Sequence, residues 1–205
     1  MKNSKPITKF YERTLVLLKP DTVQRGLIGE IILRFERKGL KITALKMVWA
    51  TKDQAQKHYD WSEDEKIATG TRTIAVYKEK GIEFNKTPIE AAEDVQRRLS
   101  KFLVAGPIIA MVIEGAHAVQ HVRKLVGHGS PLQADVGTIR ADFTIDSYLL
   151  ADEADRVSRN LVHASSSVEE AEREIKVWFE PSEIYNYELA IERILYSKEW
   201  EQFQS

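Results

Sequence analysis

The amino-acid sequence predicts an α+β fold in which a four-stranded antiparallel sheet is covered by helices. Two short runs are continuously apolar, "TLVLL" at 14–18 and "PIIAMVI" at 107–113, and such runs are typical of strands buried at the centre of a sheet. Apolar residues at helical spacing follow each run, so helices alternate with strands. Of the 205 residues, 43% are hydrophobic and 30% are charged, which is the composition of a globular domain with a full core.

The first strand and the first helix are separated by a clear signal. The strand ends at "KPD", because Pro20 cannot donate to a sheet ladder and Asp21 can cap a following helix. That helix is predicted from Val23 to Phe35, where the apolar residues form a single stripe. Gly39 then supplies a helix terminator.

The remaining elements complete the domain. The stretch "LKITALKMVW" at 40–49 alternates apolar and polar residues and changes phase near Ala44, which predicts a strand with a bulge. After the central strand at 107–113, residues 116–126 have helical spacing, and "IKVWF" at 175–179 predicts a short final strand. This order matches the ferredoxin-like, split βαβ arrangement.

Two polar, charge-rich segments, 61–95 and 144–159, are longer than a connection between elements needs. The sequence has no repeat and no flexible linker, so a single domain is predicted over 1–205, with these segments as insertions and a tail at 184–205. The first insertion is expected to be peripheral to the chemistry. The tail has helical apolar spacing and is expected to dock on this subunit or a neighbouring one.

Composition excludes several classes of protein and site. The net charge is −1, which does not suggest a nucleic acid partner, and no apolar run is long enough to span a membrane. The chain has no cysteine, so disulfides and thiolate metal sites are excluded. The charged opening residues lack the apolar segment of a signal peptide, and a cytoplasmic location is therefore expected.

One stretch, "NLVHASSSVEEAEREIKVWF" at 160–179, combines a histidine with small hydroxyls. In one interpretation, Ser166 and Glu169 form a capping box at a helix start, and His163 merely precedes it. In the other, His163 is a nucleophile at the electropositive N-terminus of a helix, where anions bind readily. The stretch alone leaves both interpretations open.

Phosphate chemistry would have to depend on side chains, because the chain has neither a G-x-x-x-x-G-K-[ST] loop nor a G-x-G-x-x-G turn after a strand. Lys19, Arg123 and Arg140 could converge on phosphoryl oxygens, although such residues are most often solvated surface charges. A zinc site at His117 and His121 is not favoured, because no third ligand stands at a suitable spacing.

Three blocks of the sequence carry motifs in a fixed order. They read "ERTLVLLKPDTVQRGLIGEIILRFERKGLKITALKM", then "GPIIAMVIEGAHAVQHVRKLVG" continuing through "GTIRADF", then "NLVHASSS" with "EREIKVWFEPSE". The Lys-Pro-Asp turn, the Gly-Thr-Ile-Arg run and the N-x-x-H-x-S motif are jointly hard to obtain by chance. Over somewhat more than half of its length, the chain resembles the nucleoside diphosphate kinase family.

The resemblance implies a ferredoxin-like fold and a nucleoside diphosphate kinase activity. This is a reversible ping-pong transfer of the γ-phosphoryl group from a nucleoside triphosphate, with ATP as the expected donor, to a nucleoside diphosphate. The transfer passes through a phosphohistidine at His163. By the same resemblance Glu174 hydrogen-bonds the other ring nitrogen. On one helix those two residues would lie about 16 Å apart, so they can touch only if His163 lies off the helix.

Further side chains match positions that contact the nucleotide or neighbour the histidine. Lys19 and Asn160 match residues that contact sugar hydroxyls and phosphates, and Arg123 and Arg140 match phosphate-binding arginines. Tyr59 matches a tyrosine beside the histidine. Ser165 matches a serine two residues after the histidine.

The resemblance also implies a cofactor and an assembly. Mg²⁺ is expected to be held mainly by the nucleotide phosphates, without dedicated protein ligands, and a homo-oligomer is expected. Two positions depart from the family pattern: Gly129 stands where the family has a phosphate-contacting threonine, with Ser130 beside it, and Ser166 stands where it has an acidic residue. These departures leave an alternative, a catalytically weakened nucleotide-binding or regulatory member of the same fold.

The second insertion, 144–159, is expected to touch function. Its apolar side chains favour docking, either on a neighbouring subunit or at the mouth of the nucleotide site. The subunit is the favoured partner, because acidic residues of the insertion would repel a triphosphate at close range. The acidic residues in question are Asp146, Asp152, Glu153 and Asp155.

Overall fold

A four-stranded antiparallel sheet forms the centre of the protein. The computed structural model describes residues 9–197, and its sheet has the strand order β2-β3-β1-β4. The strands are β1 (Tyr11–Leu18), β2 (Lys41–Trp49), β3 (Pro107–Ala116) and β4 (Val162–Ala164). Each neighbouring pair runs antiparallel. The predicted α+β, ferredoxin-like fold class is confirmed.

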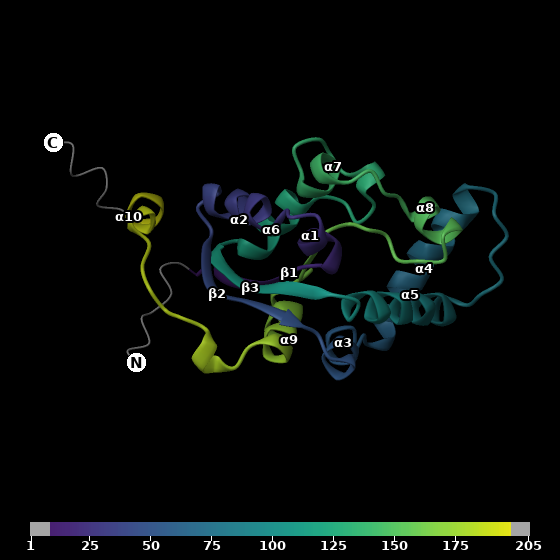
Figure 1. Ribbon diagram of the computed structural model, residues 1–205, viewed down its shortest axis with the longest axis horizontal. Helices are drawn as coiled ribbons and strands as arrows, with labels where there is room; N and C mark the ends of the chain where they lie inside the picture. The colour runs from purple at the N-terminus through teal and green to yellow at the C-terminus, as the bar shows by residue number, and fades with distance from the viewer. Residues whose placement is uncertain (1–8, 198–205) are drawn as a thin grey trace.

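Helices cover both faces of the sheet (Figure 1). They are α1 (Pro20–Gln24), α2 (Ile28–Arg37), α3 (Lys52–His58), α4 (Glu63–Glu79), α5 (Pro88–Leu103), α6 (Ala118–Val126), α7 (Ile139–Phe143), α8 (Tyr148–Glu153), α9 (Val168–Trp178) and α10 (Ala190–Tyr196), with 3₁₀ turns η1 (Pro131–Gln133) and η2 (Pro181–Glu183). In Figure 1, α2 and α6 lie above the sheet, and α3 and α9 lie below it. No helix among the described residues is long and apolar enough to cross a membrane.

Alternation along β1 divides the interior into two clusters. Val16 and Leu18 pack into one cluster with residues of α2 and α6, whereas Leu15 and Leu17 pack into the other with residues of α3, α5 and α9. Successive side chains of a strand point to opposite faces, so a strand buried on both faces must be apolar throughout. The continuous run at 14–18 is explained by this position.

The bulge predicted in β2 is confirmed, and the helix predicted before β2 is divided in two. The bulge predicted near Ala44 lies between Ile42 and Ala44, where the register against β3 shifts. The single helix predicted from 23 to 35 is instead two helices, α1 and α2, because the backbone turns at Gly26 with φ of +66°. Glycine adopts that left-handed conformation with little cost.

The final strand predicted at 175–179 is wrong. Residues 175–178 belong to α9, and the fourth strand of the sheet is Val162–Ala164. In α9 the buried residues are Ala171, Glu174, Ile175 and Trp178, a spacing of three and four that forms one face of a helix. A five-residue apolar run cannot by itself distinguish a strand from a buried helical turn.

The first insertion is built as a helical hairpin of α4 and α5. Both helices begin with a capping box, Ser62 with Glu65 and Thr87 with Glu90, which satisfies amide groups that would otherwise lack partners. The hairpin also contacts α9, since Arg173 pairs with Glu65 at 3.1 Å. Its charged residues therefore include structural contacts as well as solvated positions.

The hairpin depends on a close approach at Gly70, which gives a test by substitution. A Cβ at this position would lie 1.7 Å from the carbonyl oxygen of Pro88, so Gly70→Ala must separate the two helices. We expect a loss of about 1–3 kcal/mol in the free energy of unfolding, seen as a lower Tm. The matched control is Gly29→Ala in α2, where a Cβ meets nothing within 4 Å and helix propensity favours alanine by about 1 kcal/mol. Equal Tm changes in the two variants would contradict the packing argument.

The second insertion folds back onto the first. Arg98 of α5 pairs with Asp152 of α8 at 3.0 Å and with Asp155 at 3.5 Å, and α8 lies beside α4 in Figure 1. Asp146 is buried and pairs with Arg156 at 2.6 Å. Three of the four acidic residues thus have an arginine partner within the chain, and two of them, Asp152 and Asp155, share Arg98. These ion pairs weaken the repulsion expected at the mouth of the nucleotide site, and contact with a neighbouring subunit stays a prediction.

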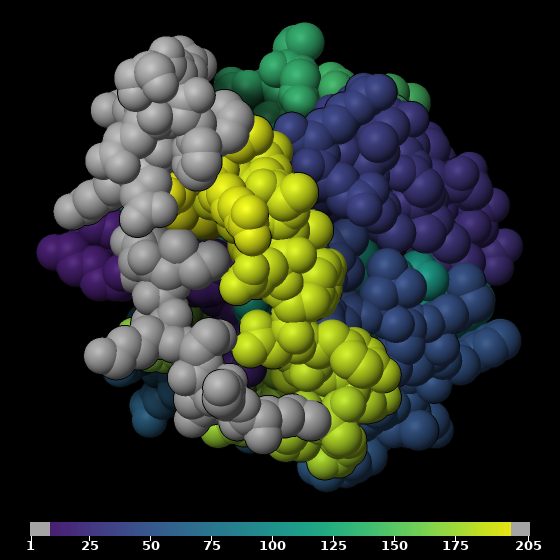
Figure 2. Space-filling model, turned by 90° about the vertical axis from the view of Figure 1, so that its left-hand side faces the viewer, coloured from purple at the N-terminus to yellow at the C-terminus, as the bar shows by residue number. Residues whose placement is uncertain are grey.

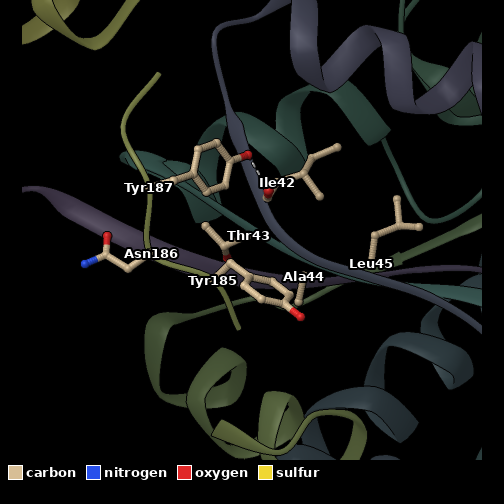
Figure 3. A pocket seen from close by; sticks show the side chains of 7 residues that line it. All are labelled: Ile42, Thr43, Ala44, Leu45, Tyr185, Asn186 and Tyr187. Carbon is tan, nitrogen blue, oxygen red and sulfur yellow. Dashed lines mark hydrogen bonds between the residues drawn. The ribbon is translucent and has the colours of Figure 1, made fainter. Parts of the chain in front are cut away.

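The C-terminal segment docks on its own subunit along β2. The Tyr185 amide donates to Thr43 O at 2.8 Å, and the Tyr187 hydroxyl donates to Ile42 O at 2.7 Å (Figure 3). Beyond it, Glu192 of α10 pairs with Lys41 at 3.0 Å, and Figure 2 shows this segment against residues of the first quarter of the chain. The last residues of the predicted tail, 198–205, lie outside the described part.

Candidate active site

His163 lies on the short strand β4, where two contacts fix its orientation. It is directly opposite Leu17 of β1, so its side chain lies on the same face of the sheet as Leu17, toward α3 and α9. Leu161, the residue just before β4, has a φ of +68°, a strained conformation for a residue with a branched side chain. Its carbonyl accepts from Lys19 N at 2.8 Å and Thr22 Oγ1 at 2.7 Å, so the turn after β1 holds the strand in place.

Glu174 of α9 hydrogen-bonds the imidazole of His163. The distance from His163 Nε2 to a carboxylate oxygen of Glu174 is 2.9 Å, so the histidine does lie off the helix and fold back, as contact required. Ser165 donates to the same carboxylate at 2.6 Å. Glu174 is buried, and burial raises its pKa, while the Ser165 hydrogen bond opposes that rise.

The environment keeps the imidazole of His163 uncharged. Burial lowers its pKa to about 3, and the charges of Lys19 and Arg140 contribute in the same direction. A neutral imidazole has one protonated and one bare nitrogen. Because Nε2 faces the Glu174 carboxylate, it carries the proton, and Nδ1 is left with a free lone pair. A neutral imidazole with one free nitrogen is a competent nucleophile at pH 7.

His58, at the end of α3, is a member of the site that sequence reasoning missed. Its ring centroid lies 4.4 Å from that of His163, and its Nδ1 lies 3.5 Å from Glu174. Trp178 Nε1 donates to the same Nδ1 at 3.4 Å, so this nitrogen is unprotonated. Burial lowers the pKa of His58 to about 3. In the sequence, only its position immediately before Tyr59, which was expected beside the catalytic histidine, pointed to it.

Tyr59 is buried in the same cluster but packs on His58. The two ring centroids are 4.6 Å apart, and His58 is the ring that lies against His163. Burial raises the pKa of the Tyr59 hydroxyl, and the charge of Glu174 adds to the effect. Tyr59 therefore supports the histidine pair as a neutral packing residue.

A chain of hydrogen bonds links three of the expected nucleotide-binding residues. Lys19 Nζ donates to Asn160 Oδ1 at 2.6 Å, and Asn160 Nδ2 donates to Gly129 O at 2.7 Å. Gly129 thus contributes its carbonyl group to the site. Burial lowers the pKa of Lys19 to about 8, and the neighbouring charge of Arg140 lowers it further.

The two arginines are placed differently. Arg140 donates to three backbone carbonyls, those of Gly127, Asn160 and Val162, at 2.9, 3.1 and 2.6 Å. It therefore joins the loop around 127 to the strand of His163, and burial lowers its pKa to about 10. Arg123 is exposed on α6, and its charge also lowers the pKa of His163.

The helix cap near His163 lies one residue later than predicted. The N-cap of α9 is Ser167, whose side chain accepts from Glu170 N at 3.1 Å. Ser166 donates to the Glu170 carboxylate instead. The capping interpretation is therefore correct in kind but one residue out of place, and the nucleophile interpretation stays a prediction. A cap is present, and it leaves His163 outside the helix beside Glu174.

The pKa of Lys19 gives a prediction for the pH profile. If charged Lys19 contacts the nucleotide, kcat/KM is retained below pH 8 and falls as the ammonium loses its proton through about pH 8. His163 stays neutral from about pH 4 upward, so it adds no loss between pH 5 and 8. Steady-state rates measured from pH 5 to pH 10 show whether kcat/KM falls in this way. A constant kcat/KM up to pH 10 would show that Lys19 is not a titrating contact.

The described residues contain one group of histidine and acidic side chains close enough to share a metal ion, namely His58, His163 and Glu174. It offers two nitrogens and one carboxylate, and His163 Nε2 is already hydrogen-bonded to the carboxylate, while His58 Nδ1 accepts from Trp178. Mg²⁺ prefers oxygen ligands and usually takes them from phosphates, water and one or two carboxylates. The site therefore fits a Mg²⁺ ion carried by a nucleotide better than one held by the protein.

Comparison with known proteins gives one consistent result. The nucleoside diphosphate kinase family model matches residues 12–184. The nucleoside diphosphate kinase of Pyrobaculum aerophilum is 49% identical over 178 residues, 84% of this chain and 97% of the relative. That of Archaeoglobus fulgidus is 42% identical over 187 residues, 91% of this chain and 99% of the relative.

Solved structures agree with the sequence comparisons. An NDP kinase crystal structure from Pyrobaculum aerophilum superposes with a TM-score of 0.82 at 46% identity, covering 86% of this chain and all of the other. A transition-state mimic of the Borrelia burgdorferi nucleoside-diphosphate kinase, with bound vanadate and ADP, superposes with a TM-score of 0.78 at 35% identity, covering 93% of this chain and 99% of the other. On the matched family model, the close relatives and the shared fold, the chain belongs to the nucleoside diphosphate kinase family of phosphotransferases.

Proposed function

We propose that His163 is the nucleophile of a ping-pong phosphoryl transfer. The Nδ1 lone pair attacks the γ-phosphorus of a nucleoside triphosphate, the bond from that phosphorus to the bridging oxygen breaks, and its electron pair leaves with the diphosphate. A second nucleoside diphosphate then attacks the phosphohistidine, and the free imidazole is restored. The observation that carries the proposal is the 2.9 Å contact of Nε2 with Glu174, which leaves Nδ1 available.

Glu174 and Ser165 support the nucleophile in this proposal. Attack by Nδ1 gives the ring a positive charge, and the carboxylate beside Nε2–H stabilises that charge. Ser165 is fully buried and donates to the same carboxylate, which fixes its orientation. His58 packs edge-on against the ring of His163, and Tyr59 packs on His58.

Four charged or polar side chains are proposed to bind the substrates, which are nucleoside triphosphates and diphosphates with ATP as donor. Lys19 and Asn160 are already joined at 2.6 Å, and Arg140 lies against the strand of His163. Arg123 is exposed on the helix that follows β3. The charges of Lys19, Arg140 and Arg123 bind the phosphates and also keep the imidazole of His163 neutral. Mg²⁺ is proposed as the cofactor, and it neutralises charge on the β- and γ-phosphates when bound.

A phosphoenzyme assay tests the proposal against the alternative of a catalytically weakened member. The protein is mixed with γ-labelled ATP and Mg²⁺, and the label on the protein is followed. We expect an acid-labile, base-stable label that a nucleoside diphosphate removes, since phosphoryl groups on histidine nitrogen hydrolyse in acid. Nucleotide binding without any such label would favour the alternative.

We also propose that the protein is a homo-oligomer. The proposal rests on exposed apolar side chains of the edge strand β2. Its outer half carries Leu45, Met47 and Trp49, which are 51%, 56% and 65% exposed. Alternate residues of a strand share a face, so these three form a continuous apolar row. The single domain over 1–205 and the cytoplasmic location stay predictions.

Substitution at the apolar row tests the oligomer. Met47→Asp places a charge in the centre of the row, and we expect sedimentation velocity to show a shift to smaller species. The control is Ile67→Asp on α4, a residue of similar exposure, 41%, away from the edge strand. An unchanged assembly in Met47→Asp, or an equal shift in both variants, would show that β2 is not the contact.

A further inference from the structure

Gly129 and Tyr148 occupy the same small volume beside the nucleotide-binding residues. A Cβ built on Gly129 would lie 2.3 Å from the Tyr148 hydroxyl oxygen and 3.6 Å from the ring carbon that bears it. The hydroxyl thus stands where a side chain at 129 would begin. Only glycine leaves room for it, because a Cβ at position 129 would overlap the hydroxyl oxygen.

The position of Tyr148 is fixed by the second insertion. It is the first residue of α8, whose N-cap Ser147 accepts from Leu150 N at 3.1 Å. The ends of the insertion are tied together, because Thr144 Oγ1 donates to Arg159 O at 3.0 Å. The far end of α8 is held to α5 by the Arg98–Asp152 pair. The ring is therefore presented by a braced element and is 36% exposed.

The surroundings of the hydroxyl belong to the phosphate end of the site. Gly129 O accepts from Asn160, which in turn accepts from Lys19. Burial raises the pKa of Tyr148, whereas the nearby positive charges of Arg140 and Arg72 lower it. Among the described residues, no hydrogen-bond partner of this hydroxyl is found. A neutral O–H near positive charge is suited to donate to an anionic oxygen.

We propose that the Tyr148 hydroxyl is a substrate-positioning group of the kinase site, donating a hydrogen bond to a phosphate oxygen of the bound nucleotide. The insertion at 144–159 thereby supplies a group that position 129 lacks. This inference rests on the proposed function, since it needs nucleotide phosphates at Lys19, Asn160 and Arg140.

Tyr148→Phe removes the hydroxyl alone and tests the contact directly. Calorimetric titration of the full chain with ADP and Mg²⁺ should show a Kd about tenfold higher than for the unsubstituted protein, the usual effect of losing a hydrogen bond to a charged group. Titration with adenosine should give an unchanged Kd, because adenosine has no phosphate. An ADP Kd unchanged to within twofold would overturn the proposal, and so would equal weakening of both ligands.

A double-substitution cycle separates the hydroxyl from a general effect of position 129. Gly129→Ala should displace the Tyr148 hydroxyl and raise the ADP Kd about tenfold. In the Tyr148→Phe background the clash is absent, since the next ring atom is 3.6 Å away, so the added methyl group should change the Kd by less than twofold. Equal effects of Gly129→Ala in both backgrounds would contradict the shared-volume argument. The double variant Gly129→Thr with Tyr148→Phe carries the hydroxyl on residue 129 instead of residue 148. It should recover most of the affinity for ADP.

These outcomes are distinguishable from failure of the proposed function. Tyr148→Phe should still form the phosphohistidine at saturating ATP, because His163 and Glu174 are unchanged. If no variant and no unsubstituted protein forms a phosphoenzyme, the proposed function fails while the ADP titrations still decide the role of Tyr148.

Discussion

Replacing His163 with alanine is expected to abolish phosphoryl transfer, lowering kcat by at least about 10⁴-fold, because loss of a covalent nucleophile removes the reaction path itself. Binding of ADP should remain measurable, since Lys19, Asn160 and Arg140 are retained and bond mainly to one another and to backbone groups. Coupled-assay rates and ADP titration of the same preparation measure the two quantities.

The matched control for this substitution is His121→Ala, which removes a part-exposed imidazole of α6 outside the site. Its rate should stay within twofold of the unsubstituted protein. Transfer by His163→Ala at the unsubstituted rate would show that the nucleophile lies elsewhere.

Glu174→Gln is expected to lower kcat by about 10²-fold while leaving the phosphohistidine detectable. The amide oxygen still accepts from Nε2–H and from Ser165, so the ring stays in place, but the negative charge that stabilises the forming cation is lost. Rapid-quench measurement of phosphoenzyme formation isolates this step from nucleotide release.

The control for Glu174 is Glu172→Gln on the same helix, a carboxylate that pairs with Arg13 on the surface side of α9. A surface pair contributes at most about 1 kcal/mol, and its loss should leave the rate of phosphoenzyme formation unchanged. If Glu174→Gln reacted within twofold of the unsubstituted rate, the charge of Glu174 would have no catalytic part.

Much of the fold could be predicted because its central strands have an unambiguous pattern. β1 and β3 are apolar on both faces, and the bulge near Ala44 is visible as a change of phase in β2. β4 could not be found in this way. It is three residues long, and the strained turn at Leu161 before it is held by contacts with Lys19 and Thr22, which lie far away in the sequence.

The site was predictable to the extent that motifs contain it. His163, Glu174, Lys19 and Asn160 come together as expected. His58 was missed, because a lone histidine near a helix end has no pattern of its own and gains its place only when α3 packs against α9. Arg140 was expected at phosphates, yet its three carbonyl contacts also brace the strand that carries His163. Those contacts depend on tertiary structure that no local spacing reports.

The insertions show the same limit. Their polar composition predicted surface elaboration, and most of their residues are indeed exposed or half-buried. Gly129 has no side chain, and the hydroxyl of Tyr148, nineteen residues later, lies against it. Only the three-dimensional structure relates the two positions.

The position of the phosphoryl group on the enzyme tests the central claim most directly. Phosphoenzyme made with ATP and Mg²⁺ can be mapped by mass spectrometry, and the substituted nitrogen can be assigned by phosphorus–proton NMR. The account predicts a single phosphohistidine at His163, with phosphorus on Nδ1, because Nε2 is hydrogen-bonded to Glu174. Phosphorus on Nε2, or on any residue other than His163, would contradict it.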